Sequence, residues 1–175
     1  MGTERCGMVA IVGRPNVGKS TLLNHLLGQK ISITSRKPQT TRHRILGVST
    51  HEAVQIVYVD TPGLHQGEGK AINRAMNRAA LGAVRDVDLV LMVVDRLYWL
   101  EPDEQVLAAV RAAGKPVLLI INKTDQVEHK DALLPHIAAL QEKHAFAAIV
   151  PVSALKGHNL EALEREIAQR LPEAP

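Results

Sequence analysis

Short runs of apolar residues alternate with segments of helical periodicity along the whole chain, and this pattern predicts an α/β fold. The apolar runs are rich in Val, Ile and Leu and are largely uninterrupted by polar residues. Such runs are typical of parallel strands that are covered on both faces of a sheet. The segments that predict strands are 8–12, 44–49, 54–59, 89–94, 117–121 and 147–150.

Between these segments, apolar residues recur three and four positions apart, as they do on one face of an α-helix. Pro102 is suited to the start of one helix and Gly28 to the end of another. Two polar segments, 29–42 and 61–70, have no periodicity and are predicted to be loops. The predicted helices lie at 20–27, 72–79, 102–110, 137–140 and 160–171.

Strands that alternate with helices predict a doubly wound α/β sheet, six-stranded and mostly parallel, with helices on both faces. The short turn near His51 joins segments 44–49 and 54–59 as a hairpin, so one edge strand is expected to be antiparallel. In such sheets, ligands bind beyond the carboxyl ends of the strands. Functional residues are therefore expected where the strands end.

The composition is that of one globular domain with its own core. The chain has 175 residues, of which 46% are hydrophobic and 22% charged, and a domain of this length needs no disulfide or metal to stabilise it. The single cysteine, Cys6, excludes an intrachain disulfide and is predicted to be a small core residue. No two histidines lie three or four positions apart, so structural zinc is not expected.

The charge and the aromatic content do not favour direct reading of nucleic acid by this domain. Subtracting 18 acidic from 21 basic residues leaves a net charge of only +3. Aromatic residues make up 2% of the chain, too few for platforms on which bases stack. The apolar runs are too short to span a membrane and the start lacks a signal-peptide pattern, so we expect a cytoplasmic protein without membrane insertion.

Residues 13–20, Gly-Arg-Pro-Asn-Val-Gly-Lys-Ser, match the phosphate-binding pattern G-x-x-x-x-G-K-[ST] between a predicted strand and a predicted helix. The glycines allow backbone amides to approach a phosphate, and the helix directs its positive end to the same place. Lys19 is then placed for the β- and γ-phosphates and Ser20 for Mg²⁺. A chance match is the alternative, and the flanking strand and helix disfavour it.

Asp60-Thr61-Pro62-Gly63 follows the predicted strand 54–59. Asp60 can hold the shell of a Mg²⁺ ion through water, and the Gly63 amide can meet the γ-phosphate. Alone, this tetrad is an ordinary β-turn. Beside a phosphate-binding loop, it is interpreted as the metal side of the same site.

Asn122-Lys123-Thr124-Asp125 follows the strand 117–121, where a base pocket is expected. The Asp125 carboxylate can accept hydrogen bonds from N1–H and the C2 amine of guanine, which adenine does not offer. Lys123 can lie along the base and contact the phosphate-binding loop. Ser153-Ala154-Leu155-Lys156 follows the last predicted strand and fits a loop whose amide meets the guanine O6, although alone this signal is weak.

The order and spacing of these four segments resemble those of the translation-factor-related class of GTPases. Residues 32–44, 58–65 and 71–76 are similar to the corresponding segments of the Era family of bacterial ribosome-assembly GTPases, and the resemblance covers 5–175. It implies a P-loop GTPase fold that binds GTP or GDP with Mg²⁺ and acts as a molecular switch. GTP would order 29–42 and 60–70, and hydrolysis would release them.

The resemblance also assigns roles to individual residues. It makes Thr41, a better match than Thr40, the residue that binds Mg²⁺ and senses the γ-phosphate. The metal ligands are then Ser20, Thr41 and Asp60, and the catalytic residues Lys19, Thr41 and Asn16. The residues expected to contact the nucleotide are Gly13, Arg14, Pro15, Asn16, Val17, Gly18, Lys19, Ser20, Thr21, Asp60, Thr61, Pro62, Gly63, Leu64, Asn122, Lys123, Thr124, Asp125, Ser153, Ala154 and Leu155.

Two positions bear on the rate of hydrolysis. Leu64 stands where Ras-like GTPases have a Gln that orients the attacking water, so we expect turnover at or below about 10⁻³ s⁻¹. Asn16 matches the residue by which related GTPases hold K⁺ against the phosphates. The other interpretation of Asn16 is a simple turn former, and the sequence favours neither.

The resemblance implies that 1–171 form the GTPase domain and that 172–175 begin a linker to a C-terminal KH domain that these residues do not include. In the family, that domain binds the rRNA of the small ribosomal subunit during 30S assembly, and peripheral membrane association is implied as well. Specific rRNA binding by the present residues is therefore expected to be weak or absent. Two alternatives stay open: a sibling GTPase of the same class, and a nucleotide-gated binding module with incidental hydrolysis.

Overall fold

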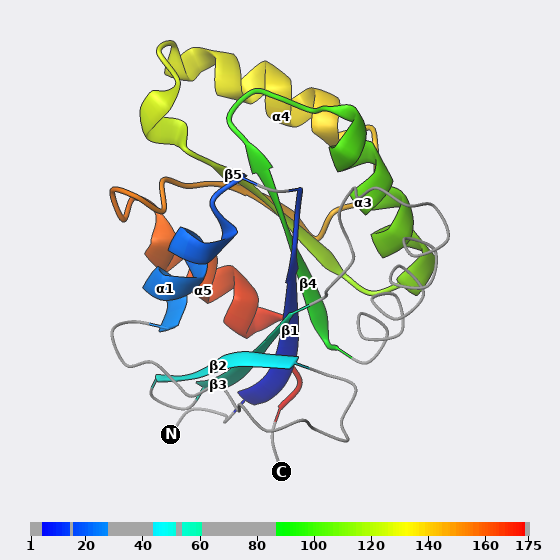
Figure 1. Cartoon of the computed structure of the whole chain (residues 1–175), viewed down its shortest axis with the longest axis vertical. Helices are drawn as coiled ribbons and strands as arrows, with labels where there is room; N and C mark the ends of the chain where they lie inside the picture. The colour runs from blue at the N-terminus through cyan, green and yellow to red at the C-terminus, as the bar shows by residue number, and fades with distance from the viewer. Residues whose placement is uncertain (1–4, 15, 28–43, 52–53, 61–86, 174–175) are drawn as a thin grey trace.

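The computed structural model describes residues 5–14, 16–27, 44–51, 54–60 and 87–173 as a sheet with helices on both faces (Figure 1). The strands are β1 (Arg5–Val12), β2 (Arg44–His51), β3 (Val54–Asp60), β4 (Leu89–Asp95), β5 (Val117–Asn122) and β6 (Ala148–Pro151). The helices are α1 (Lys19–Leu27), α3 (Glu101–Ala113), α4 (Leu133–Gln141) and α5 (Leu160–Gln169), with 3₁₀ turns η1 (Thr124–Gln126) and η2 (Lys130–Ala132).

The six strands form one sheet in the order β2-β3-β1-β4-β5-β6. β1 pairs in parallel with both β3 and β4, and the β4–β5 and β5–β6 pairs are also parallel. β2 is the exception, because it runs antiparallel to β3 with a register shift between Ile45 and Gly47. The predicted fold class, a mostly parallel six-stranded sheet with one antiparallel edge strand, is confirmed.

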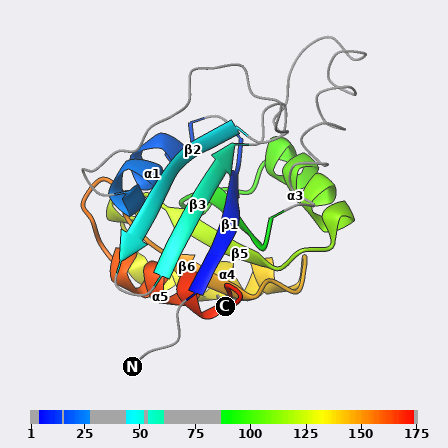
Figure 2. The same cartoon turned by 90° about the horizontal axis from the view of Figure 1, so that it is seen from below.

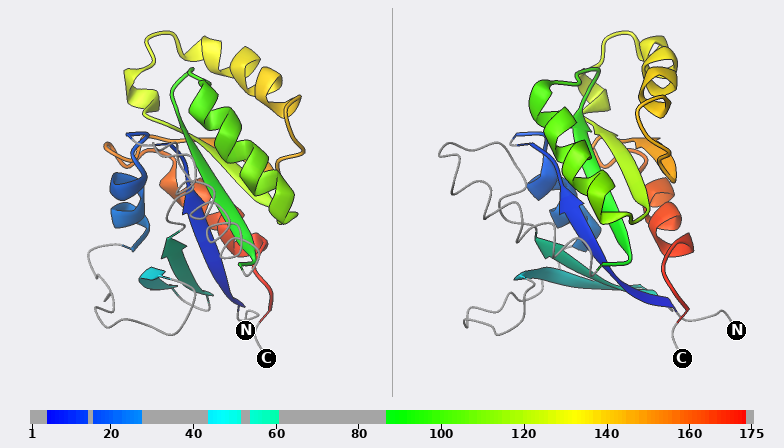
Figure 3. Two further views of the ribbon diagram at one scale, coloured as in Figure 1. Left: turned by 45° about the vertical axis from the view of Figure 1, so that its right-hand side comes forward. Right: turned by 90° about the vertical axis from the view of Figure 1, so that its right-hand side faces the viewer.

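Helices α1 and α5 cover one face of the sheet, and α3 and α4 cover the other (Figures 1 and 2). In the left view of Figure 3, the strands lie between α1 on the left and α3 on the right. Each face has its own buried cluster, since alternate residues of β1, β4 and β5 point to opposite sides. This arrangement explains why the strands contain uninterrupted apolar runs.

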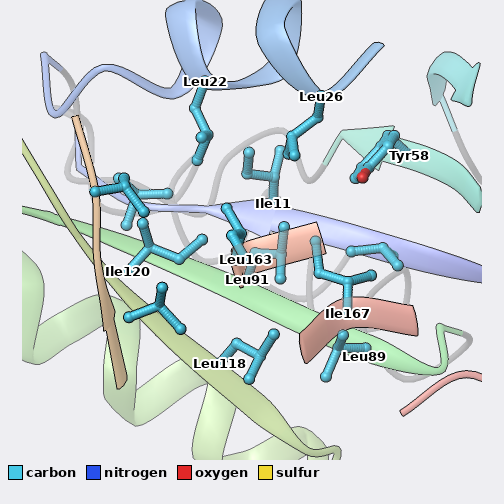
Figure 4. Packing of buried hydrophobic residues seen from close by; sticks show 14 of the residues in the cluster. Ile11, Leu22, Leu26, Tyr58, Leu89, Leu91, Leu118, Ile120, Leu163 and Ile167 are labelled. Atoms are coloured by element: carbon cyan, nitrogen blue, oxygen red, sulfur yellow. The ribbon is translucent and has the colours of Figure 1, made fainter. Parts of the chain in front are cut away.

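Figure 4 shows the cluster on the face of α1 and α5. Leu22 and Leu26 of α1 and Leu163 and Ile167 of α5 pack with strand residues such as Leu91. The residues of the opposite cluster that come from the helices are Val106, Leu107, Val110 and Leu140. The predicted apolar residues of α3 are buried, as are Leu163 and Ile167 of α5, whereas in α4 Leu140 is buried and Ile137 only partly so.

The predictions differ from the structure at element ends and at Cys6. β1 begins at Arg5, and β3, β4 and β5 each extend one residue further, to Asp60, Asp95 and Asn122. The prediction that Cys6 is a core residue is wrong, because its side chain is exposed. Along its face of β1, Cys6 is exposed, Met8 half-buried and Ala10 fully buried, so the start of the strand projects beyond the apolar cluster.

The described C-terminal residues lie against the start of β1. The Cys6 amide donates to the Pro172 carbonyl at 3.2 Å, and the Arg5 side chain donates to the Leu171 carbonyl at 2.7 Å. A Cβ at Gly7 would lie 2.7 Å from the Leu171 side chain, so the close approach depends on glycine. Pro172 and Glu173, predicted to begin a linker, are thus in contact with the sheet.

Other expectations concern residues outside the described ones. These are the predicted helix at 72–79 and the loops at 29–42 and 61–70. Among the described helices, none is long and apolar enough to cross a membrane.

Leu163→Ala tests the cluster shown in Figure 4. Leu163 is fully buried, so we expect its truncation to lower the free energy of unfolding by about 2–5 kcal/mol. Urea denaturation measures the loss. Leu134→Ala on α4 is the matched control: this side chain is 73% exposed, and its removal is expected to change stability by less than about 0.5 kcal/mol. Equal losses in both variants would contradict the packing described here.

Candidate nucleotide-binding site

Four described segments meet at the edge of the sheet where the parallel strands end. They are 13–14 and 16–18 after β1, 96–100 after β4, 123–126 after β5 and 152–159 after β6. The chain termini of the described part, Arg5 and Glu173, pair with each other at the opposite end of β1. The sequence motifs that follow β1, β5 and β6 are therefore neighbours in space, whereas most of the motif at 60–63 lies outside the described residues.

Backbone conformation and close packing both require glycine in the loop after β1. Gly18 has φ +96°, and a Cβ there would lie 2.2 Å from the Asn122 side-chain nitrogen. A Cβ at Gly13 would lie 2.7 Å from the Val93 carbonyl oxygen. The Lys19 ammonium donates a hydrogen bond to the Gly13 carbonyl, so its side chain lies back across the loop. The loop leads into α1, and the amides at the start of a helix attract anions.

Asn122 joins three of the four segments through one buried side chain. Its Nδ2 donates to the Val17 carbonyl at 2.9 Å, and its Oδ1 accepts from the Ala154 amide at 3.0 Å. The residue is only 2% exposed, so both hydrogen bonds are made away from water. The loops after β1 and β6 therefore have a common attachment at the end of β5.

Asp125 and Ser153 form a second link between the ends of β5 and β6. The Ser153 hydroxyl donates to Asp125 Oδ1 at 2.6 Å and accepts from the Lys156 amide at 3.1 Å. The hydrogen bond from Ser153, with smaller contributions from the nearby charges of Lys156 and His158, holds the pKa of Asp125 below its ordinary value of 3.8. Asp125 is thus a fixed carboxylate at neutral pH, able to accept hydrogen bonds from a ligand.

Lys123 lies beside the loop after β1, as the sequence predicts. Its backbone is left-handed with φ 65°, and its ammonium donates to the Asn16 carbonyl at 2.8 Å. Asn16 is also left-handed, with φ 69°, a conformation that asparagine adopts more readily than most residues. This left-handed backbone favours the interpretation of Asn16 as a turn-forming residue.

Sequence reasoning missed Asp95, which the structure places at the centre of this edge. Its carboxylate is 2.9 Å from Arg96 Nε, 3.6 Å from Lys123 Nζ and 3.9 Å from Arg14 Nη2. Asp103 at the start of α3 was missed too, and it lies 3.1 Å from Arg14 Nε. Asp95 had a usable signal, because it follows an apolar strand just as Asp60 and Asn122 do.

The remaining predicted site residues are placed as follows. Ser20 and Thr21 are exposed in the first turn of α1, and the Thr124 amide donates to the Val152 carbonyl. Leu155 is 67% exposed, and of Asp60 only the backbone at the end of β3 is described. Pro15, Thr41, Thr61, Pro62, Gly63 and Leu64 lie outside the described residues.

This edge of the sheet places groups suited to an anion near a carboxylate that can accept hydrogen bonds. Amides at the start of α1 and the Lys19 ammonium suit phosphate, and Asp125 suits a base that offers two donors. Within the described ranges, no cluster of three His, Cys, Asp or Glu side chains could hold a metal by itself.

The fold and this edge define a GTPase domain of the P-loop class. The family model described as "50S ribosome-binding GTPase" matches residues 8–123, and the chain belongs to this family. The resemblance to Era is confirmed: the chain is 62% identical over 169 residues to "GTPase Era" of Pseudomonas fluorescens and 59% identical over 171 residues to that of Marinobacter nauticus. These alignments cover 97% and 98% of the chain but 56% of each relative, so the chain spans little more than half their length.

Solved structures agree with this assignment. A crystal structure of Era with MgGDPNP and nucleotides 1506–1542 of 16S ribosomal RNA superposes with a TM-score of 0.82 at 41% identity, over 98% of this chain and 59% of that one. The G domain of the T. maritima FeoB iron transporter superposes with a TM-score of 0.65 at 29% identity, over 94% of this chain and 98% of that one.

Ser153→Ala tests the origin of the low Asp125 pKa. Without the hydroxyl donor, we expect the pKa of Asp125 to rise toward 3.8, as measured by NMR titration of its carboxyl carbon. A depressed pKa stabilises the fold above the unfolded-state pKa, and this contribution is lost as the pH falls through the folded-state value. The variant should therefore lose less stability than the wild type below about pH 4. Ser49→Ala on β2 is the control, and an unchanged Asp125 titration in Ser153→Ala would contradict this interpretation.

Proposed function

We propose that this domain binds GTP and GDP with Mg²⁺, hydrolyses GTP slowly and acts as a molecular switch. The observation that carries the proposal is the buried Asn122 side chain, which holds the phosphate-binding loop and the Asp125–Ser153 pocket in one site. The named relatives, and the solved Era structure that contains MgGDPNP, support the same nucleotide.

The loop 13–18 and the first turn of α1 would bind the phosphates. Their amides approach the oxygens, and Lys19 would turn from the Gly13 carbonyl toward the β- and γ-phosphates. Ser20, Thr41 and Asp60 would hold Mg²⁺, with Asp60 acting through water. Bound there, Mg²⁺ supplies positive charge that stabilises the phosphates during in-line attack by water. The fit rests on Ser20, which is exposed in the turn that begins α1.

The ends of β5 and β6 would bind the base. Asp125 would accept from the two donors of guanine, Lys123 would lie along its plane, and the amide of Ala154 or Leu155 would approach its O6. Ser153 and Asn122, expected from the sequence to contact the nucleotide, would also hold the base-binding residues in place, since each is buried and hydrogen-bonded within the protein. The other residues named in the sequence analysis would contribute backbone or van der Waals contacts.

Hydrolysis by this domain alone would be slow. Leu64 has no group that could orient water, and Lys19, the loop amides and Mg²⁺ are left to stabilise the developing charge. Asn16 would add a K⁺ ligand beside the phosphates. The domain would therefore spend long periods in each nucleotide state, as a switch requires.

In the longer protein, we propose that 1–171 form the GTPase domain and that 172–175 lead to a KH domain. The relatives are nearly twice as long as this chain, and one solved relative is bound to a segment of 16S ribosomal RNA. The nucleotide state would then control rRNA binding and 30S subunit assembly in the cytoplasm, with peripheral membrane association as a further family property. Specific rRNA binding would require the part outside these residues.

Asp125→Asn tests the base pocket. An asparagine side chain offers one acceptor and one donor group in place of two acceptors, so it mismatches guanine and matches the C2 carbonyl of xanthine. We expect GDP affinity to fall by about 10²-fold or more and affinity for xanthosine diphosphate to rise, measured by calorimetry. Asp131→Asn in the exposed turn η2 is the charge-matched control. Unchanged GDP binding in Asp125→Asn, or tight ATP binding by the wild type, would contradict the assignment.

GTP turnover in KCl and in NaCl tests the role of Asn16. We expect a rate at or below about 10⁻³ s⁻¹ in NaCl, a clear increase in KCl, and loss of that increase in Asn16→Ala. Asn24→Ala, exposed on α1, is the control and should keep the increase. Equal slow rates in both salts would contradict the K⁺ site and favour a GTP-gated switch that needs a partner. Fast turnover in both salts would contradict the proposed slow enzyme.

A further inference from the structure

Asp103 is a fully buried carboxylate at the start of α3, and it makes two contacts of different kinds. Its Oδ2 accepts from the Leu100 amide at 2.8 Å and from Arg14 Nε at 3.1 Å. Its Oδ1 is buried, and no described group donates to it. The side chain has no exposed surface at all, so this charge is held away from water.

The hydrogen bond to the Leu100 amide does not by itself call for a buried charge. It is a helix-capping contact, and uncharged Asn, Ser or Gln side chains make equivalent ones at helix starts. A buried carboxylate is costly unless an opposite charge pairs with it. The partner that compensates this charge is Arg14, which comes from the phosphate-binding loop 89 residues earlier in the chain. The burial of Asp103 is therefore explained by its contact with that loop.

Arg14 is held from a second side by Asp95. The guanidinium of Arg14, whose side chain is 13% exposed, lies between Asp103 and the carboxylate of Asp95, 3.9 Å away. Asp95 also lies 3.6 Å from Lys123, which donates to the Asn16 carbonyl. The residues on either side of Pro15 are thus both attached to this pair of carboxylates, Arg14 directly and Asn16 through Lys123.

The backbone in the same region is in an unfavourable conformation. Of the four described non-glycine residues with positive φ, Arg96 and Lys123 pair with Asp95, and the Asn16 carbonyl accepts from Lys123. Such residues are retained only where surrounding contacts hold them, and they tend to occur at functional sites. The ion pairs of Asp95 and Asp103 are contacts of this kind, since they act on these residues or their neighbours.

We propose that Asp103 is a positioning residue of the nucleotide site: through Arg14, and together with Asp95, it holds the phosphate-binding loop in its binding conformation before nucleotide arrives. The inference rests on the proposed function and adds α3 to the site. A loop ordered in advance loses less conformational freedom on binding, so affinity is higher. The contact between Asp103 and Arg14 acts on the loop itself, so the affinities for GDP and for GTP should depend on it equally.

The test compares Asp103→Asn with Glu104→Gln. Asn retains an acceptor for the Leu100 amide but removes the charge that Arg14 needs. Glu104 is the matched control, because it loses the same charge from the same helical turn while its contacts are to Trp99 and Lys143 instead. We expect Kd for GDP and for GTP to rise about tenfold in Asp103→Asn and to change less than about twofold in Glu104→Gln.

Two further measurements separate positioning from a purely structural role. In nucleotide-free protein, hydrogen exchange at the amides of 16–18 should accelerate in Asp103→Asn. If Asp103 only caps α3, faster exchange would be confined to 101–106 and both Kd values would stay unchanged, which would overturn the proposal. A double-mutant cycle with Arg14→Gln adds a second readout: the double variant should lose no more affinity than Asp103→Asn alone, whereas additive losses would show that Arg14 acts without Asp103.

Nucleotide binding by the wild type separates a failure of the proposed function from a failure of the positioning role. If it binds neither GDP nor GTP, the proposed function fails. If it binds both and Asp103→Asn binds them equally well, only the positioning role fails. Should Asp103→Asn not fold, the Arg14→Gln variant tests the same pair from the partly exposed side, with the same expected loss for both nucleotides and the same exchange measurement.

Discussion

The carboxamide of Asn122, the last residue of β5, donates to Val17 in the loop after β1, 105 residues earlier, and accepts from Ala154 in the loop after β6, 32 residues later. Both bonds are buried, so breaking one would leave an unpaired polar group in the interior. The loops after β1 and β6, to which the phosphates and the base are proposed to bind, therefore cannot move apart without that cost. The short distance between Asn122 and the backbone of Gly18 follows from the same contact.

Charge pairs add a second layer of order around this attachment. Asp95 is the last residue of β4, and Asp103 lies in the first turn of α3. Asp95 pairs with Arg14, Arg96 and Lys123, and Asp103 pairs with Arg14. All of them lie at the carboxyl edge of the sheet, where side chains from separate loops approach one another. Because the Arg14–Asp103 pair is largely removed from water, salt screens it less than a pair on the surface. The loops at this edge are thus held in part by Asp95 and Asp103, which are not themselves expected to touch a ligand.

Much of the fold could be predicted because it follows from local patterns of apolar residues along the sequence. Uninterrupted apolar runs such as 89–94 and 117–121 are stable only when both faces of the strand are covered, which requires a parallel sheet with helices on each side. Errors occurred at element ends and at Cys6, where the sequence pattern is apolar but the strand extends beyond the buried cluster. Strand ends are set by which residues the neighbouring strands and helices reach, and this information is not local.

The sequence by itself determined the chemistry of the site: a glycine-rich loop with Lys19, a carboxylate at Asp125 and their places after buried strands, since residue types and strand ends can both be read along the chain. Only the tertiary structure decided what holds these groups in place. Asn122 bonds to Val17, 105 residues earlier, and to Ala154, 32 residues later. Asp103 pairs with Arg14, 89 residues earlier. Contacts between segments so far apart leave no periodicity in the sequence, because they arise only when the sheet brings the ends of its strands together.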